Sequence, residues 1–174
     1  MIGLKRGTVK LLPHNKKWKK LFAKEKAALE NKLNGLVVDI QHIGSTSIFG
    51  IPAKPIIDMS LGLRKLRDAK KLIKPLATLG YEWRKGVSGP NQQLFVKGPE
   101  EKRTHYLHVM RYNGGVWRHD ILFRDYLRKD PPRAKDYAVL KEKLAAQYAD
   151  NRGTYTKKKA EFILETIKIA KKRL

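Results

Sequence analysis

Residues 42–58 read HIGSTSIFGIPAKPIID, and this stretch joins two segments that have the pattern of β-strands. The segment Val37–Ile43 is rich in β-branched residues, which favour strands. Residues 56–63 alternate apolar side chains with small or polar ones, and Asp58 belongs to the polar set. Glycine and proline interrupt the residues between the two segments. The stretch therefore predicts a strand, a turn and a second strand that carries Asp58.

The turn begins with four residues whose chemistry suits a phosphate group, namely Gly44, Ser45, Thr46 and Ser47. Glycine lets the backbone approach a phosphate, and hydroxyls and free N–H groups hold its oxygen atoms. Twelve residues separate Ser45 from Asp58. A carboxylate on the neighbouring strand is placed to hold a metal ion, such as Mg²⁺, that bridges phosphate oxygens. The alternative is a turn in which the hydroxyl of Ser45 or Thr46 caps a helix.

Two more polar residues of this stretch are candidates for the same site. His42 is predicted to be catalytic together with Asp58, either as a general acid or base or as a donor to a phosphate. The alternative for His42 is a hydrogen bond that shapes the loop. Lys54 precedes the second strand and is predicted to bind a phosphate as a point charge or to pair with Asp58. The alternative for Lys54 is a solvated loop lysine.

Candidate residues also lie outside this stretch. His105 and His108 are three positions apart in a predicted strand, so they point to opposite faces and do not bind one ion together. His108 is predicted to face the site and to be a metal ligand there, with a core residue as the alternative. Lys159 follows Tyr155 by four positions, which places both on one face of a helix. Lys159 is a predicted phosphate ligand, with a solvated lysine as the alternative.

The other elements surround this unit in the order of an α+β protein. Periodicity predicts helices over residues 13–33, 66–79, 117–128, 132–149 and 156–172, and strands over residues 81–84, 93–97 and 105–111. We expect Pro75 to kink or split its helix, and Pro131-Pro132 to begin another. The sequence thus predicts a mixed β-sheet packed with helices in residues 1–115 and a helical block in residues 116–174, together forming one domain.

The charge balance is the strongest feature of the composition. Lysine and arginine number 39 against 16 acidic residues, which gives a formal net charge of +23. Such a charge attracts polyanions, so RNA is a candidate partner; the alternative is a lysine-rich surface without a specific partner. The aromatic residues are scattered along the chain and predict no platform for stacking bases.

Cysteine usage and hydropathy bear on the compartment. The chain contains no cysteine, which suits a reducing environment and excludes disulfides. No apolar run approaches the roughly 18 residues that a membrane-spanning helix needs. The first ten residues lack the apolar core and small residues of a secretory signal. We therefore expect a cytoplasmic protein without a membrane partner.

The stretch 42–58 closely resembles the signature of the GrpB family. The resemblance continues through Trp18, Gly80-Tyr81, residues 105–109, Trp117 and residues 123–127, 137–141 and 155–159, and so extends over nearly the whole chain. It implies the fold of the nucleotidyltransferase superfamily, in which a Gly-Ser loop and an acid on the next strand bind nucleotide and metal. Similar domains also occur fused to dephospho-coenzyme A kinase, which implies a context near coenzyme A metabolism.

The chain departs from the pattern of active nucleotidyltransferases at position 60. Metal-dependent members carry a second acid two residues after the first, where this chain has Ser60. The third acid is expected on a later strand, and residues 105–111 contain none. Three hypotheses follow: a nucleotidyltransferase-like enzyme that uses Mg²⁺ at Asp58, a non-catalytic binder of nucleotide or RNA, and a partner-binding domain.

Overall fold

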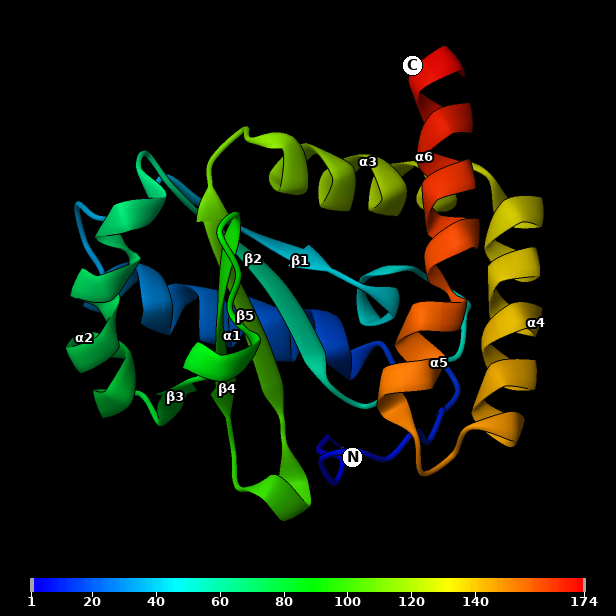
Figure 1. Ribbon diagram of the computed structural model, residues 1–174, viewed down its shortest axis with the longest axis horizontal. Coiled ribbons are helices and arrows are strands. Elements are labelled where there is room, and N and C mark those ends of the chain that lie inside the picture. Colours follow the sequence, from blue (N-terminus) through cyan, green and yellow to red (C-terminus); the bar gives the residue numbers. More distant parts are fainter. Residues whose placement is uncertain (1, 174) are drawn as a thin grey trace.

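The computed structural model describes residues 2–173, and its centre is a five-stranded mixed sheet (Figure 1). The strands are β1 (Asp39–Ile43), β2 (Ile57–Leu63), β3 (Tyr81–Trp83), β4 (Gln92–Lys97) and β5 (His105–Arg111). Their spatial order is β1-β2-β5-β4-β3. β2 and β5 run parallel, and the other neighbouring pairs are antiparallel. β2 and β5 therefore each have a neighbour on both sides, which holds their side chains in a fixed register.

One face of the sheet is apolar and packs against two helical segments. These are α1 (Lys17–Lys32) and the segment that contains α2 (Ile73–Thr78). Met59 of β2 is completely buried in this core, and Trp18 of α1 is only 1% exposed. The alternation predicted for residues 56–63 is confirmed, so Asp58 and Ser60 point to the opposite face of the sheet.

The opposite face meets a block of four helices (Figure 1). These are α3 (Gly115–Lys129), α4 (Pro131–Gln147), α5 (Arg152–Lys158) and α6 (Ala160–Arg173). α3 lies against β1, β2 and β5, and a second apolar core that includes Phe123, Tyr137 and Ile167 joins it to α4 and α6. Asp130 caps α4 just before the two prolines, because its carboxylate accepts from the Arg133 N–H at 3.0 Å. The predicted α+β class, with a mixed sheet and a C-terminal helical block, is confirmed.

Two predicted helices are divided in the structure. Residues 66–79 form a 3₁₀ helix, Leu66–Leu72, followed by α2, because Pro75 has no N–H with which to continue one α-helical ladder. The single helix predicted for residues 156–172 was wrong. α5 begins at Arg152, four residues earlier than the predicted start, because Asn151 caps it through a hydrogen bond from the Thr154 N–H. A tight turn at Lys159 separates α5 from α6.

The first helix also begins later than Pro13. The side chain of Asn15 accepts a hydrogen bond from the Lys17 N–H at 2.9 Å, which fixes the start of α1 at Lys17. Three further 3₁₀ turns are Ser45–Ser47, Lys85–Val87 and Glu100–Lys102. Among residues 2–173, no helix is both long enough and apolar enough to cross a membrane.

Candidate functional site

The polar face of the two central strands collects most of the predicted site. The parallel register pairs Asp58 with Tyr106 and Ser60 with His108, so all four side chains belong to one face. His105 lies on the other face, near Glu25 of α1. The prediction that the two histidines point to opposite faces is therefore confirmed, with His108 on the side of Asp58.

Gly44 lies directly against Asp58. Ile43, the last residue of β1, pairs with Asp58, and the chain then turns at Gly44 with φ of 65°. A Cβ atom at Gly44 would lie 2.9 Å from Asp58 Oδ2, which is closer than real Cβ contacts. Glycine is needed here both for its backbone conformation and for its lack of a side chain. This close approach sets the loop beside the carboxylate.

Asp58 is held as a carboxylate by a hydrogen bond and by the charges around it. Burial alone would raise its pKa, but His108, Lys54 and Arg152 together lower the pKa below its ordinary value. The nearest of these groups is the imidazole of His108, whose Nε2 lies 3.7 Å from Asp58 Oδ1. Asp58 is thus charged at neutral pH and available as a ligand for a cation or as a hydrogen-bond acceptor.

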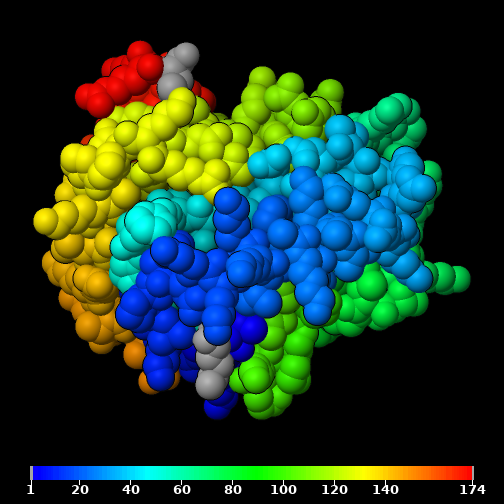
Figure 2. Space-filling model, turned by 180° about the vertical axis from the view of Figure 1, so that it is seen from behind, coloured from blue at the N-terminus to red at the C-terminus, as the bar shows by residue number. Residues whose placement is uncertain are grey.

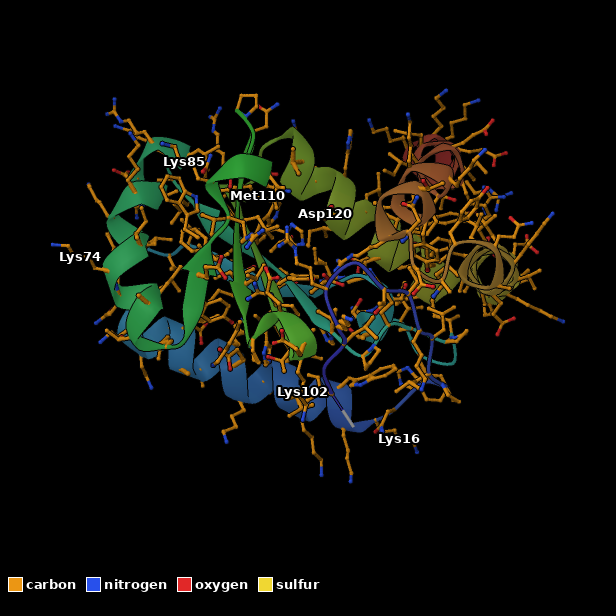
Figure 3. All side chains as sticks on the ribbon, turned by 60° about the horizontal axis from the view of Figure 1, so that its bottom comes forward. Lys16, Lys74, Lys85, Lys102, Met110 and Asp120 are labelled. Atoms are coloured by element: carbon orange, nitrogen blue, oxygen red, sulfur yellow. The ribbon has the colours of Figure 1, made fainter. Side chains whose placement is uncertain are left out.

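A second carboxylate reaches this face from outside the predicted strands. Asp120 of α3 accepts a hydrogen bond from Ser60 Oγ at 2.9 Å, and Figure 3 shows Asp120 on α3 beside the sheet. Burial raises the pKa of Asp120, and the charge of Asp58 adds to that effect, while His108 opposes it. The serine at the position expected for a second acid therefore holds an acid from elsewhere in the chain.

Sequence reasoning missed Asp120, although the sequence contains a signal for it. Trp117, Asp120, Arg124 and Leu127 recur at helical spacing, and the other three are buried. An acidic residue within an otherwise buried helical stripe indicates a side chain that faces the protein interior. Which strand it would meet depends on how the helix packs, and the spacing does not state this.

The helical block adds cations to the site. The Nζ atoms of Lys54 and Lys159 lie 5.7 and 4.5 Å from the centroid of the Tyr155 ring, and Tyr155 is almost completely buried. Arg152 of α5 stacks on the Tyr106 ring and donates a hydrogen bond to its hydroxyl. Lys54 and Lys159, the two lysines predicted to be phosphate ligands, therefore lie by the same ring although they are far apart in sequence.

Two buried lysines of this region have lowered pKa values. Burial, followed by the neighbouring charges of Arg152 and Lys159, lowers the pKa of Lys54 to about 7, and Asp58 acts in the opposite direction. Lys141 of α4 has its Nζ bonded to the Pro52 carbonyl, and burial likewise lowers its pKa to about 7. A partly buried lysine with a pKa near neutrality differs from the solvated loop lysine given as the alternative for Lys54.

His42 does not join Asp58. It pairs with Met59 in the sheet register, so it lies on the apolar face, where its ring stacks on Phe22 of α1 at 4.7 Å. Its Nε2 shares a hydrogen bond with Thr46 Oγ1 at 3.0 Å, and burial lowers its pKa to about 4. The two predicted catalytic residues therefore lie on opposite faces of the sheet, and His42 makes the loop-shaping contact that was its alternative.

The hydroxyls of the loop have different partners. Thr46 is bonded to His42, and Ser47 Oγ donates to the Gly44 carbonyl at 2.7 Å. No side chain caps the short Ser45–Ser47 turn, so the helix-capping alternative does not apply. Ser45 is half-buried, and within residues 2–173 its hydroxyl has no protein hydrogen-bond partner. It is the loop hydroxyl that is free to meet a ligand.

Arg124 has a structural place in this region. Its guanidinium donates to Asp125 Oδ1, Gln41 Oε1 and the His42 carbonyl, at 2.7, 2.8 and 3.0 Å. It is 7% exposed and fastens α3 to β1.

Comparison with known proteins places the chain in a family. The family model described as "GrpB protein" matches residues 8–168. The glutamate-rich protein GrpB of Alkalihalophilus pseudofirmus is 40% identical over 171 residues, covering 96% of this chain and 98% of that protein. The crystal structure of the conserved protein GrpB from Enterococcus faecalis is similar with a TM-score of 0.86 at 30% identity, covering 94% of this chain and 98% of the other.

A relative of different length is also similar. A protein of Mycobacterium leprae named dephospho-CoA kinase is 25% identical over 171 residues, which cover 83% of this chain and 42% of that protein. Together with the match over residues 8–168, these similarities confirm the resemblance first read from residues 42–58. The chain belongs to the GrpB family.

Proposed function

We propose that this protein binds a nucleotide, or a related phosphorylated small molecule, between the Gly44–Ser47 loop and the cations around Tyr155. The observation that carries the proposal is that Lys54 and Lys159 both lie by the Tyr155 ring, while Lys54 and Arg152 act on the Asp58 carboxylate. Within residues 2–173, these three cations form no salt bridge with a carboxylate. A phosphate would supply the negative charge that relieves their mutual repulsion.

The loop supports the same ligand from the other side. The absence of a side chain at Gly44 leaves the backbone close to Asp58, and the Ser45 hydroxyl has no protein partner among residues 2–173. A phosphate placed here would accept from Ser45 and from the cations together. Lys54 and Lys159 are the proposed phosphate ligands, with Arg152 as a third that sequence reasoning did not include.

Magnesium fits this site only if a phosphorylated ligand supplies most of the oxygen atoms that bind the ion. No group of three or more His, Cys, Asp or Glu side chains within residues 2–173 is arranged to hold a metal ion. Mg²⁺ is commonly bound through one or two carboxylates and substrate phosphates, and it prefers oxygen ligands. Asp58 is the proposed protein ligand, and His108, a nitrogen donor, would orient Asp58 in a magnesium complex. The ion would neutralise phosphate charge.

Two outcomes are consistent with this ligand. In the first, Asp120 acts with Asp58 in nucleotidyl transfer, so that Ser60 presents an acid in place of being one. In the second, the site binds nucleotide without transferring it, because Asp120 is drawn toward Ser60 and has a raised pKa. We favour the first outcome, because transfer is the chemistry that the resemblance to nucleotidyltransferases implies. Nucleotide binding is common to both outcomes.

Isothermal titration calorimetry tests the proposal. ATP, GTP, CTP, UTP and dephospho-coenzyme A are titrated with and without Mg²⁺; the last ligand addresses the similarity to a protein named dephospho-CoA kinase. Asp58→Asn is expected to abolish the gain in affinity from Mg²⁺. Lys159→Ala is expected to weaken binding about tenfold or more, whereas the exposed neighbour Lys157→Ala leaves it unchanged. Absence of binding at millimolar ligand, or equal binding by Asp58→Asn, would contradict the proposal.

Release of pyrophosphate separates the two outcomes. In transfer, an acceptor hydroxyl attacks the α-phosphorus of the nucleoside triphosphate, loses its proton and displaces pyrophosphate. With a hydroxyl acceptor such as RNA supplied, transfer chemistry predicts pyrophosphate release by the wild-type protein and its loss in Asp120→Asn. A binding protein releases none, and its nucleotide affinity is then expected to survive the same substitution.

A further inference from the structure

A second concave surface lies on the other side of the Gly44–Ser47 loop. We call it the basic groove; it lies between α1, the loop and the helices α3 and α4, and has a volume of about 1070 Å³. Its lining includes Lys16, Lys19, Phe22, His42, Phe49 and Lys135. Figure 2 shows the place where the blue N-terminal segment, the cyan loop and the yellow helical residues meet. Asp58, Lys54 and Lys159 do not line it, so the groove shares the loop residues Thr46 and Ser47 with the site described above but not its carboxylate or its two lysines.

The charge of the groove is of one sign. Lys16, Lys19 and Lys135 are exposed, and none of them has a salt bridge to a carboxylate within residues 2–173. Arg128 is also in the lining and directs two N–H groups to the Ser47 carbonyl. No aspartate or glutamate of the described chain lines the groove. Phosphates would thus find these three lysines along the groove, whereas Lys26 and Arg128 of the same lining already pair with Asp39 and Asp125.

Aromatic rings lie between these cations. Phe49 is 75% exposed, which is unusual for a phenylalanine, and its ring meets His14 edge-on at 5.1 Å. Phe22 and His42 form a stacked pair with planes 11° apart. His42 is neutral at physiological pH because burial lowers its pKa to about 4. The groove therefore offers the exposed ring of Phe49, flanked by positive charge.

We propose that the basic groove binds single-stranded nucleic acid, with lysines on the phosphates and Phe49 stacked on a base. Single-strand binders combine a positive channel with aromatic side chains that stack on unpaired bases. A duplex hides the faces of its bases, so an exposed phenylalanine in a recess would have no partner there. An acidic peptide would use the lysines and leave Phe49 unused. The volume of about 1070 Å³ also lies just above the roughly 300–1,000 Å³ of small-molecule pockets, which suits a segment of several nucleotides.

The first experiment measures the salt dependence of binding. Fluorescence anisotropy with short oligouridylate and oligothymidylate is recorded between about 50 and 300 mM NaCl. Each lysine–phosphate contact contributes about 0.7 to the slope of log K against log salt, so Lys16→Ala/Lys19→Ala/Lys135→Ala is expected to reduce the slope by about 2. The control Lys65→Ala/Lys74→Ala/Lys85→Ala removes the same charge from exposed lysines that do not line the groove. Figure 3 shows Lys74 and Lys85 at the opposite end of the molecule from Lys16.

The second experiment tests stacking. Phe49→Ala is expected to weaken oligonucleotide binding roughly fivefold or more, Phe49→Trp to retain it, and neither to change binding of heparin. No binding of either oligonucleotide at the lowest salt, equal slopes in the two triple variants, or an unchanged affinity in Phe49→Ala would each overturn the proposal. A stronger response to oligouridylate identifies RNA as the partner, and equal responses identify single strands of either kind.

The two proposals fail separately. The groove variants are expected to keep the calorimetric affinity for mononucleotides, and Asp58→Asn to keep the affinity for oligonucleotides. A loss of oligonucleotide binding in Asp58→Asn would mean that the strand occupies the Asp58 site, and would overturn the assignment to the groove.

Discussion

At the scale of single residues, the site depends on charges that are kept close together. The pKa of Asp58 is lowered by His108, Lys54 and Arg152, whereas burial, with the charges of Arg152 and Lys159, lowers the pKa of Lys54. A carboxylate and an amine with shifted pKa values in one place are more common at functional sites than elsewhere. Asp120, with a raised pKa, extends the same network through Ser60.

Gly44 provides a test of this packing. Gly44→Ala is expected to lower the free energy of unfolding by at least about 2 kcal/mol, because alanine disfavours a positive φ and its Cβ would meet Asp58. Gly50→Ala is the matched control: Gly50 has φ of 81° and open space around a Cβ, so it should lose about 1 kcal/mol. Urea denaturation measures both. Equal losses would show that the approach to Asp58 is relaxed in solution.

The lowered pKa of Lys54 leads us to expect that phosphate binding depends on pH. With a pKa of about 7, Lys54 is charged in the free protein below neutral pH and becomes neutral above it. A bound phosphate raises this pKa, so affinity is expected to be constant below about pH 7 and to fall by up to tenfold per pH unit above it. Calorimetry in buffers of different ionisation enthalpy should detect proton uptake at pH 8. Lys54→Arg, which stays charged, is expected to remove both effects.

At the scale of elements, α3 connects the sheet to the helical block. Its stripe of Trp117, Asp120 and Arg124 faces β1, β2 and β5, and so it positions Asp120 and the loop after β1 at once. Arg124 makes the strongest of these links, because it satisfies Gln41 and the His42 carbonyl from a buried position. Arg124 therefore ties α3 to β1.

Arg124→Ala is expected to destabilise the protein by about 2–4 kcal/mol, because it removes a buried group and leaves the Gln41 and His42 oxygens without their donor. Arg118→Ala serves as the control, since Arg118 is an exposed arginine of the same helix. Its effect should stay within about 0.5 kcal/mol. Thermal unfolding followed by circular dichroism distinguishes the two, and similar values for both variants would refute the role of Arg124.

The strands and the longer helices were predictable because their periodicity is local. The alternation in residues 56–63 placed Asp58 on the polar face, and the spacing of His105 and His108 placed them apart. His42 was not predictable in the same way, because its face depends on the register with Met59 across the turn. Asp120 and the basic groove depend on contacts between distant segments, which periodicity does not encode.

At the scale of the whole molecule, positive charge is the dominant quantity. The formal net charge of +23 is distributed over 174 residues, so like charges repel throughout the folded state. At the site and in the basic groove, positively charged side chains lie beside hydroxyl, carboxylate or aromatic groups that would position a ligand. A ligand at either place would lower the total repulsion as well as make local contacts.

Salt is accordingly expected to stabilise the protein. Raising the ionic strength from about 0.01 M to about 0.15 M shortens the Debye length from roughly 30 to 8 Å and screens the repulsion. The melting temperature is therefore expected to rise over this range. Sodium chloride and sodium acetate at equal ionic strength should act alike if screening is the cause. A melting temperature that falls or stays constant would mean that attractive ion pairs dominate.

The parallel pairing of β2 with β5 has a consequence for how the chain acquires its structure. Ile57 must find His105, and the strands β3 and β4 that lie between them in sequence are placed beyond β5 in the sheet. Contacts of such high sequence separation slow folding. During synthesis β1 and β2 emerge first, and β2 waits with an unpaired edge until β5 has been translated. The strand that carries Asp58 therefore keeps one hydrogen-bonding edge unpaired until the segment that completes the sheet has been synthesised.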